Sequence, residues 1–259
     1  MANTVYDNKV LESKAKDLLT TSVNTRNLMT VDYSLAENAG MVKVVNVYTY
    51  SGKAEEVAAE QGNATIGSIS FKPVEYRVKM VQQAFKYTDE DFMKDPTIVD
   101  NMMIGANQLM VNKMTADFVA EAKKATISHT FSKKISYDAI VDGISKLNLE
   151  DESKLFVLIP NAWKADLRKD PDYKSARMGE VIYNGQVGTI AGLPVIPTKA
   201  LTDEAYVMTN EAIKLFLKKD VEVEADRDKD KRINFEYLRT AYLVALADNT
   251  KICKLTVGA

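Results

Sequence analysis

Strict alternation of apolar and charged residues marks residues 74–80, which read Val-Glu-Tyr-Arg-Val-Lys-Met. A run rich in Val and Tyr precedes it at residues 41–50, and a polar stretch at residues 51–63 follows that run. A period of two is typical of a strand, so the two runs predict a long β-hairpin with a polar tip. Because an isolated two-stranded hairpin is marginally stable in water, we expect a second copy of the chain to cover its apolar side. A hairpin within an ordinary sheet is the alternative.

A long helix is predicted after the hairpin. Thr88 followed by three acidic residues is typical of a helix N-terminus, and Asp95-Pro96 marks a second start with Pro at the first helical position. Up to residue 125, apolar residues then recur every four positions: Ile98, Met102, Ala106, Met110, Met114 and Phe118. Since this spacing drifts around a helix of about 3.6 residues per turn, we expect the helix to contact neighbours on more than one side.

Strands and helices alternate in the second half of the chain. We expect Ser136 to cap a short helix and the apolar run at residues 155–159 to form a central strand. Gly and Pro then separate short strands such as residues 193–196, and residues 211–217 are expected to form a turn or short helix. The remaining residues return to β alternation and end in a closing strand at residues 252–257.

Composition and charge limit the classes of partner. The chain has 259 residues, 46% of them hydrophobic and 27% charged, with a formal net charge of -2. This charge implies neither strong attraction to nucleic acid nor a polybasic membrane contact. No apolar run approaches the ~18 residues of a membrane span, so we expect no membrane partner. The first forty residues are polar and are expected to form an arm lying on other surfaces, with a short helix at residues 11–19.

Residues suited to catalysis are sparse. His129 is the single histidine, and it lies beside Ser and Thr where the composition changes. Cys253 is the single cysteine, so no internal disulfide can form, and its place in the closing strand favours a small buried side chain over a nucleophile. The chain also lacks a phosphate-binding loop and a dinucleotide fingerprint. We therefore expect no cofactor and no enzyme activity.

Three acidic residues near the C-terminus resemble the start of a calcium loop: Asp226, Asp228 and Asp230. The sixth position of such a loop would be Lys231 instead of Gly, and the twelfth would be Tyr237 instead of Glu. We therefore expect no metal site here. A solvated turn, or charge contacts between subunits, is the better interpretation of the interleaved basic residues: Arg227, Lys229 and Arg232.

The order of these elements resembles the major capsid proteins of tailed bacteriophages, the Hong Kong 97-type shell fold. Residues 54–62, with Phe-Lys-Pro-Val at 71–74, resemble the hairpin tip of that family. Residues 87–93 (Tyr-Thr-Asp-Glu-Asp-Phe-Met) resemble the lead-in to its spine helix. Residues 135–140 resemble the start of its axial domain, and residues 190–196 resemble its Gly-x-Pro-Val strand.

The resemblance implies an α+β fold with a defined division of the chain: an N-arm at 1–40, an E-loop hairpin at 41–80, a P-domain with the spine helix at 81–135, an A-domain at 136–219 and a P-domain β segment at 220–259. Such subunits form pentamers and hexamers of an icosahedral shell that holds double-stranded DNA without sequence-specific contacts. The implied role is structural, in the virion capsid after assembly in the bacterial cytoplasm. Contacts between subunits are then expected at E-loop residues: Lys53, Glu55, Glu56, Val74, Tyr76 and Val78.

Two family features bear on assembly. Many members carry a long N-terminal scaffolding segment that a protease removes, whereas here the E-loop begins near residue 41. We expect no large cleaved segment, with a separate scaffolding protein and a portal as partners. Some members crosslink an E-loop Lys to an Asn of a neighbour. Lys53 lies in the tip, but no motif identifies a partner, so we expect noncovalent assembly and a monomer band after boiling in detergent.

Two alternatives remain open at the level of sequence. An encapsulin-like nanocompartment shell would share the fold, although the polar N-arm differs from a strong N-terminal helix that docks cargo. An α/β enzyme or ligand-binding protein would need a convergent set of catalytic or phosphate-binding residues, which the sequence lacks.

Overall fold

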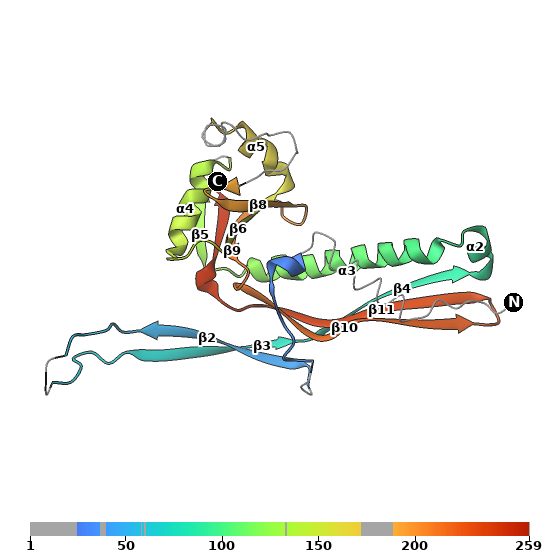
Figure 1. Ribbon diagram of the computed structural model, residues 1–259, viewed down its shortest axis with the longest axis horizontal. Helices are drawn as coiled ribbons and strands as arrows, with labels where there is room; N and C mark the ends of the chain where they lie inside the picture. Colours follow the sequence, from blue (N-terminus) through green and yellow to red (C-terminus); the bar gives the residue numbers. More distant parts are fainter. Residues whose placement is uncertain are drawn as a thin grey trace.

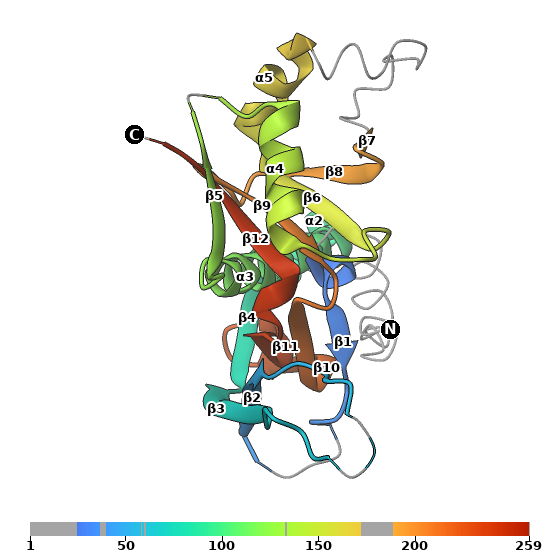
Figure 2. The same ribbon diagram turned by 90° about the vertical axis from the view of Figure 1, so that its left-hand side faces the viewer.

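The computed structural model describes residues 25–36, 40–57, 59, 61–132, 134–171 and 189–258. The helix expected at residues 11–19 lies outside the described residues. Figure 1 shows three parts: a two-stranded hairpin, a four-stranded sheet with a long helix along it, and a second sheet with shorter helices. Seen along the hairpin, the second sheet and its helices lie at the end of the molecule opposite to the hairpin (Figure 2).

The four-stranded sheet has the strand order β1-β10-β11-β4. Its strands are β1 (Thr30–Asp32), β10 (Ile213–Asp228), β11 (Ile233–Leu246) and β4 (Lys79–Thr88). The prediction of a turn or helix at residues 211–217 is wrong, because β10 begins at Ile213. Leu215 and Phe216 are buried in two different clusters on the two sides of this strand. A segment covered on both faces lacks the polar alternation that identifies a strand.

The helical start at Thr88 is confirmed. Thr88 is the N-cap of α2 (Asp89–Lys94): its hydroxyl accepts the Asp91 N–H at 3.1 Å, and the Asp91 carboxylate accepts the Thr88 N–H at 3.2 Å. This reciprocal pair is a capping box. The long helix α3 (Ile98–Ala122) begins two residues after Pro96, with Thr97 as its N-cap.

The buried residues of α3 confirm that it contacts neighbours on more than one side. Val99 and Met103 belong to a cluster with β10 and β11, whereas Phe118 and Ala122 belong to a second cluster that includes both sheets. At the start of the helix the buried side chains are Val99 and Met103, one position after the predicted Ile98 and Met102. A spacing of four residues exceeds one helical turn of about 3.6 residues, so a strict four-residue series drifts around the helix. At the N-terminal end of α3 the series therefore no longer lies on the buried face.

The second sheet has the strand order β5-β12-β9-β6-β8-β7. Its strands are β5 (Ile127–Phe131), β12 (Ile252–Val257), β9 (Glu204–Thr209), β6 (Leu155–Pro160), β8 (Leu193–Thr198) and β7 (Thr189–Ile190). β6 is buried along its whole length, which confirms the predicted central strand. The helical elements that accompany this sheet are α4 (Tyr137–Leu147), η2 (Asn161–Trp163) and α5 (Lys164–Lys169). The Ser136 hydroxyl accepts the Ala139 N–H at 3.2 Å, so the predicted cap of α4 is confirmed.

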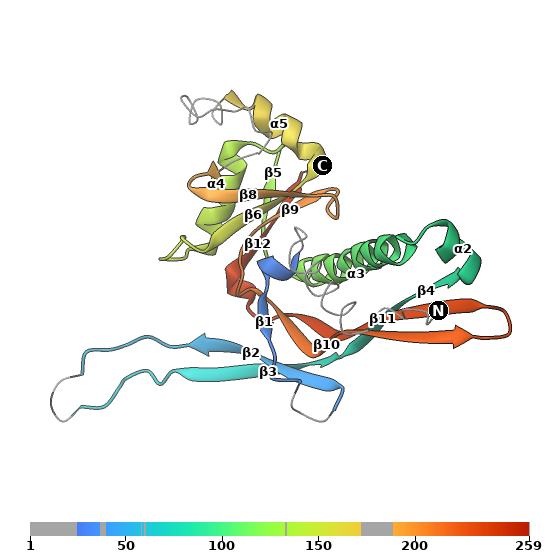
Figure 3. The ribbon, with the colours of Figure 1, turned by 45° about the vertical axis from the view of Figure 1, so that its right-hand side comes forward.

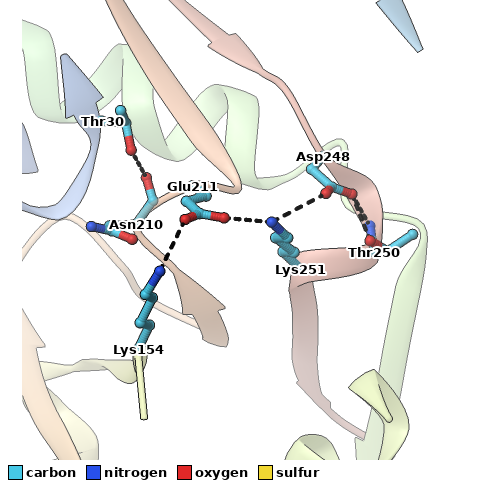
Figure 4. Close-up of polar contacts among 7 residues, drawn as sticks. All are labelled: Thr30, Lys154, Asn210, Glu211, Asp248, Thr250 and Lys251. Carbon is cyan, nitrogen blue, oxygen red and sulfur yellow. Dashed lines mark hydrogen bonds and ion pairs between the residues drawn. The ribbon is translucent and has the colours of Figure 1, made fainter. Parts of the chain in front are cut away.

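A polar cluster ties the two sheets together where the chain passes between them (Figure 4). Glu211, in the β9–β10 connection, pairs with Lys154 at 3.4 Å and with Lys251 of η4 (Asn249–Lys251). Thr30 donates its hydroxyl to the Asn210 carbonyl at 2.9 Å, which adds β1 to the same joint. The η1 turn (Thr25–Leu28) precedes β1. No helix in the described part of the chain combines the length and apolar character needed to cross a bilayer.

The predicted hairpin is confirmed. β2 (Val42–Ser51) pairs with β3 (Ser68–Arg77) in one antiparallel register without shifts. One residue, Val78, separates β3 from β4, so the alternating run at residues 74–80 belongs to two sheets. The strand at 79–88 was not predicted from the sequence, because its exposed face carries uncharged residues such as Met80 and Ala84 as well as polar ones.

The β7–β8 turn offers a test of backbone strain. Ala191 has φ 50° and precedes Gly192 at φ 80°. An L-residue with a side chain is disfavoured in this region by roughly 1–2 kcal/mol. We expect Ala191→Gly to relieve this strain and to raise the free energy of unfolding. The gain should be at most about 1 kcal/mol, because the larger unfolded-state entropy of glycine offsets part of it. Ala120→Gly, at an exposed position of α3, should instead lower it by about 1 kcal/mol, and urea unfolding followed by circular dichroism compares the two.

Candidate interaction surface

The two faces of the hairpin have different surroundings. In the β2–β3 register Lys43 lies opposite Tyr76 and Val45 opposite Val74, so these four side chains share one face. Tyr76 and Val45 pack against the buried cluster of Phe216, Leu243 and neighbouring residues of the four-stranded sheet. We call this the inner face, and Figure 3 shows the hairpin root beneath that sheet, with α3 on the other side.

Part of the predicted contact set lies against its own subunit. Val78 is 7% exposed and belongs to the same cluster as Phe216, so it is already buried within its own subunit, and its contact with a neighbouring subunit stays a prediction. Tyr76 is half-buried within its own chain, and Val74 lies on the same inner face. Burial, followed by the nearby Glu121 carboxylate, raises the pKa of Tyr76 to about 12. Tyr76 and Val78 attach the hairpin to its own subunit, because both pack against the cluster of Phe216 and Leu243.

The outer face of the hairpin carries apolar residues that are about half or more exposed in the subunit. Its members are Val42 and Val44, each 49% exposed, Ile69 at 66% and Phe71 at 62%. We call these four residues the outer hairpin face. In the register, Val42 and Val44 lie opposite Arg77 and Glu75, whereas Ile69 and Phe71 lie nearer the tip. Exposed apolar side chains on a projecting element are typical of a protein interaction site. Sequence reasoning missed Ile69 and Phe71, although the Ser-Ile-Ser-Phe alternation at residues 68–71 was a usable signal.

The hairpin tip is held in shape by its own backbone. Gly52 has φ 136°, and a Cβ added to it would lie 2.6 Å from the Gly67 Cα, so the two strands approach too closely for a side chain. The Glu55 carboxylate accepts the backbone N–H groups of Ala64 at 2.8 Å and Thr65 at 3.2 Å. Hydrogen bonds from Thr65 and then Ala64 lower the pKa of this carboxyl. Glu55 therefore has a role within the tip.

The tip also presents exposed side chains. Lys53 and Glu56 are exposed, and Ile66 is 89% exposed. A contact of Lys53 and Glu56 with a second subunit stays a prediction.

The basic residues of the β10–β11 turn are largely occupied within the chain. Arg227 pairs with Asp89 at 2.7 Å, and Arg232 lies 3.8 Å from Glu90, so both contact the first turn of α2. Lys229 is exposed. Inter-subunit charge contacts by these three residues stay a prediction.

The aspartates of that turn organise its backbone. Asp228 accepts the N–H groups of Asp230 at 3.1 Å and Lys231 at 3.2 Å. Within the described ranges, no group of three or more His, Cys, Asp or Glu side chains could hold a metal ion.

The single histidine, His129, is partly buried, and the single cysteine, Cys253, is fully buried. His129 Nε2 lies 3.6 Å from an Asp142 carboxylate oxygen on α4. Cys253 is buried, and burial raises the pKa of its thiol to about 11. A thiol with such a pKa stays protonated near neutral pH and is a poor nucleophile.

One buried carboxyl makes the stability of the subunit depend on pH. Glu236 is 8% exposed on β11, paired with Ala225 and Phe85, and its Oε2 has no hydrogen-bond partner among the described residues. Burial raises its pKa from 4.5 to about 7. Between these values the folded state keeps a proton that the unfolded state has lost. The free energy of unfolding should therefore fall as pH rises from 4.5 to 7, and then stay level.

Glu236→Gln should remove this dependence. At pH 8 we expect the variant to be more stable than the parent by about 1–3 kcal/mol, and at pH 4 the two should be similar. Urea unfolding at pH 4, 6 and 8 measures the difference, and Glu150→Gln in an exposed loop is the matched control. A parent protein whose stability is flat over this interval would contradict the prediction.

We compared the sequence and the fold of this chain with those of known proteins. The chain matches no protein-family profile. It is 25% identical over 238 residues to a protein described as "Major capsid protein" of Staphylococcus phage phiMR11, covering 88% of this chain and 85% of that one. The solved structures that resemble it include the capsid structure of the Cyanophage P-SCSP1u and a virus-like particle from Pyrococcus furiosus.

The structural agreement extends over most of each chain. The cyanophage capsid chain gives a TM-score of 0.70 at 11% identity, covering 89% of this chain and 86% of that chain. The Pyrococcus furiosus particle gives a TM-score of 0.67 at 12% identity, covering 95% and 98%. The fold is therefore the α+β architecture of Hong Kong 97-type capsids, and the resemblance to tailed-phage major capsid proteins indicated by the sequence is confirmed.

Proposed function

We propose that this chain, which has the Hong Kong 97-type capsid fold, is the major capsid protein of a tailed bacteriophage and assembles into pentamers and hexamers of an icosahedral shell. Its role is then structural, and its place is the virion capsid after assembly in the host cytoplasm. The shell would hold double-stranded DNA, which a subunit with a net charge of -2 contacts without strong phosphate binding. A separate scaffolding protein and a portal complete the proposed set of partners.

The outer hairpin face is the observation that carries this proposal. Ile69 and Phe71 are more than half exposed on a hairpin that projects from the body (Figure 1). Burying each side chain fully would be worth roughly 1.5–3 kcal/mol, so a second copy that covers them gains substantial association energy. A chain that works alone would have no use for this surface.

The far half of the four-stranded sheet is the proposed partner of that surface. On the sheet face opposite α3, Phe235 and Tyr237 stack with ring centroids 6.3 Å apart, and the Arg239 guanidinium lies 5.4 Å from the Tyr237 ring centroid. An open depression lined partly by Glu224, Tyr237 and Arg239 lies on this face. Aromatic residues and Arg are enriched at interfaces.

These two surfaces differ, so contact between them would be head-to-tail. The hairpin tip and the β10–β11 turn lie at opposite ends of the molecule (Figure 1). A head-to-tail contact generates a closed ring when the rotation between subunits closes. Rings of five and six subunits are the proposed products.

The division of the chain follows from the same proposal. Residues 1–40 would be the N-arm, residues 41–80 the E-loop with β2 and β3, and residues 81–135 the part of the P-domain that contains α3 as the spine helix. Residues 136–219 would form the A-domain and residues 220–259 the P-domain β segment. β10 begins at Ile213, so this strand would cross the proposed boundary at residue 219.

Electron microscopy of the purified protein tests the proposal. Closed shells or capsomer rings are expected, and treatment with nuclease followed by protein gels identifies their contents. Protein cargo at a fixed ratio to the shell would favour the nanocompartment alternative. A stable monomer at all concentrations, with saturable binding of a small ligand, would overturn the proposal.

A further inference from the structure

The hairpin is joined to the body through a narrow base. On the return side, Val78 alone lies between β3 and β4, and its N–H donates to the Met41 carbonyl at 2.8 Å. On the entry side, Gly40 precedes β2 with φ 115° and has no heavy atom within 4 Å of an added Cβ. The entry side restricts the direction of the hairpin little, whereas on the return side the buried Val78 packs in the cluster of Phe216 and Leu243. That direction therefore depends on side-chain contacts at the root of the hairpin.

Two opposite side chains on the inner face supply those contacts. Lys43 and Tyr76 are direct partners in the β2–β3 register. Lys43 Nζ lies 5.3 Å from the Phe216 ring centroid on β10 and donates to the Ser34 hydroxyl at 3.3 Å. Lys43 therefore holds the hairpin to the four-stranded sheet and to the segment that follows β1.

Tyr76 reaches a different element. Lys124 Nζ lies 5.3 Å from the Tyr76 ring centroid, and the nearby carboxylate of Glu121, in the last turn of α3, contributes to the raised pKa of Tyr76. Glu121 in turn accepts from Lys124 at 2.6 Å and from the Leu246 N–H at 3.4 Å. Through Glu121, Tyr76 is thus linked both to the end of α3 and to the end of β11.

We propose that Tyr76 is the positioning residue that sets the direction of the hairpin relative to the body and couples that direction to the end of α3. The contact is suited to this role because a ring held between a cation and apolar neighbours has little rotational freedom. A change in the position of the last turn of α3 would move Glu121 and Lys124, and with them the hairpin. Any effect of the hairpin direction on the angle between subunits rests on the proposed function, whereas the positioning role of Tyr76 does not.

Distance measurements on the unassembled subunit test this inference. Spin labels on Lys53→Cys in the tip and Asn112→Cys on the exposed side of α3 report the hairpin direction by double electron–electron resonance, and Cys253 is buried away from the label. We expect Tyr76→Ala to widen the distance distribution at least 1.5-fold. Tyr76→Phe, which keeps the ring but loses the hydroxyl, should give a smaller change. Glu75→Ala, on the outer face of the same strand, should leave the distribution unchanged.

The outcomes separate this inference from the proposed function. An unchanged distribution in folded Tyr76→Ala, checked by circular dichroism, would overturn the positioning role even if the protein forms shells. A widened distribution in a protein that never assembles would support the positioning role and count against the capsid proposal.

Discussion

Replacing Ile69 and Phe71 together by aspartate is expected to abolish particle formation while the subunit stays folded. Both side chains are largely exposed in the subunit, so their loss should change the free energy of unfolding by less than about 0.5 kcal/mol. In an assembled contact, the change removes roughly 3 kcal/mol of apolar burial and adds two charges that would need desolvation. A loss of this size lowers each association constant by at least about 100-fold.

Light scattering and electron microscopy at matched protein concentration measure this effect. The control is Ser68→Asp with Ser70→Asp, which places two charges on the same strand but on the opposite face. This control should still assemble. Normal particles from the Ile69 and Phe71 variant would show that the outer hairpin face is not an interface, and a blocked control would show that both faces are covered.

Replacing Asp117 by alanine is expected to lower the free energy of unfolding by about 2–3 kcal/mol at pH 7. Asp117 is buried on α3 and accepts from Lys79 of β4 at 3.0 Å, from Lys113 at 3.1 Å and from the Tyr242 hydroxyl of β11 at 2.9 Å. Truncation leaves the Tyr242 hydroxyl buried without an acceptor, whereas the two half-exposed lysines can return to water. The effect is therefore dominated by the lost link between α3 and the sheet.

The pH dependence of this link has a definite sign. Burial alone raises the pKa of Asp117, but hydrogen bonds from Lys79, Lys113 and Tyr242 outweigh burial and hold it below the ordinary value of 3.8. The stabilising contribution is present above that value and is lost as the pH falls through the folded-state pKa.

Asp117→Ala should therefore differ most from the parent near neutral pH and least in strong acid. Exposed Asp203→Ala is the matched control and should cost less than about 0.5 kcal/mol. Equal unfolding midpoints in urea for Asp117→Ala and the parent at pH 7 would contradict the prediction.

Local signals in the sequence predicted several elements correctly. The Thr88 capping box, the Ser136 cap and the apolar run of β6 depend on contacts within a few residues or on burial of a whole segment. The strand at 79–88 was missed because its exposed face carries uncharged residues such as Met80 and Ala84, and the start of β10 was missed because it is covered on both faces. The resemblance to capsid proteins depended on the order of elements and survived these errors.

The candidate surface illustrates the limit of the sequence more sharply. The pattern of β2 and β3 determined by itself that a hairpin forms, since alternation and a polar tip are local properties. It could not determine which face is free, because valines occupy both faces of β2, at Val42 and Val44 on one and Val45 on the other. Only the tertiary structure decided this, when Phe216 and Leu243, distant in sequence, covered the face with Tyr76 and left Ile69 and Phe71 exposed.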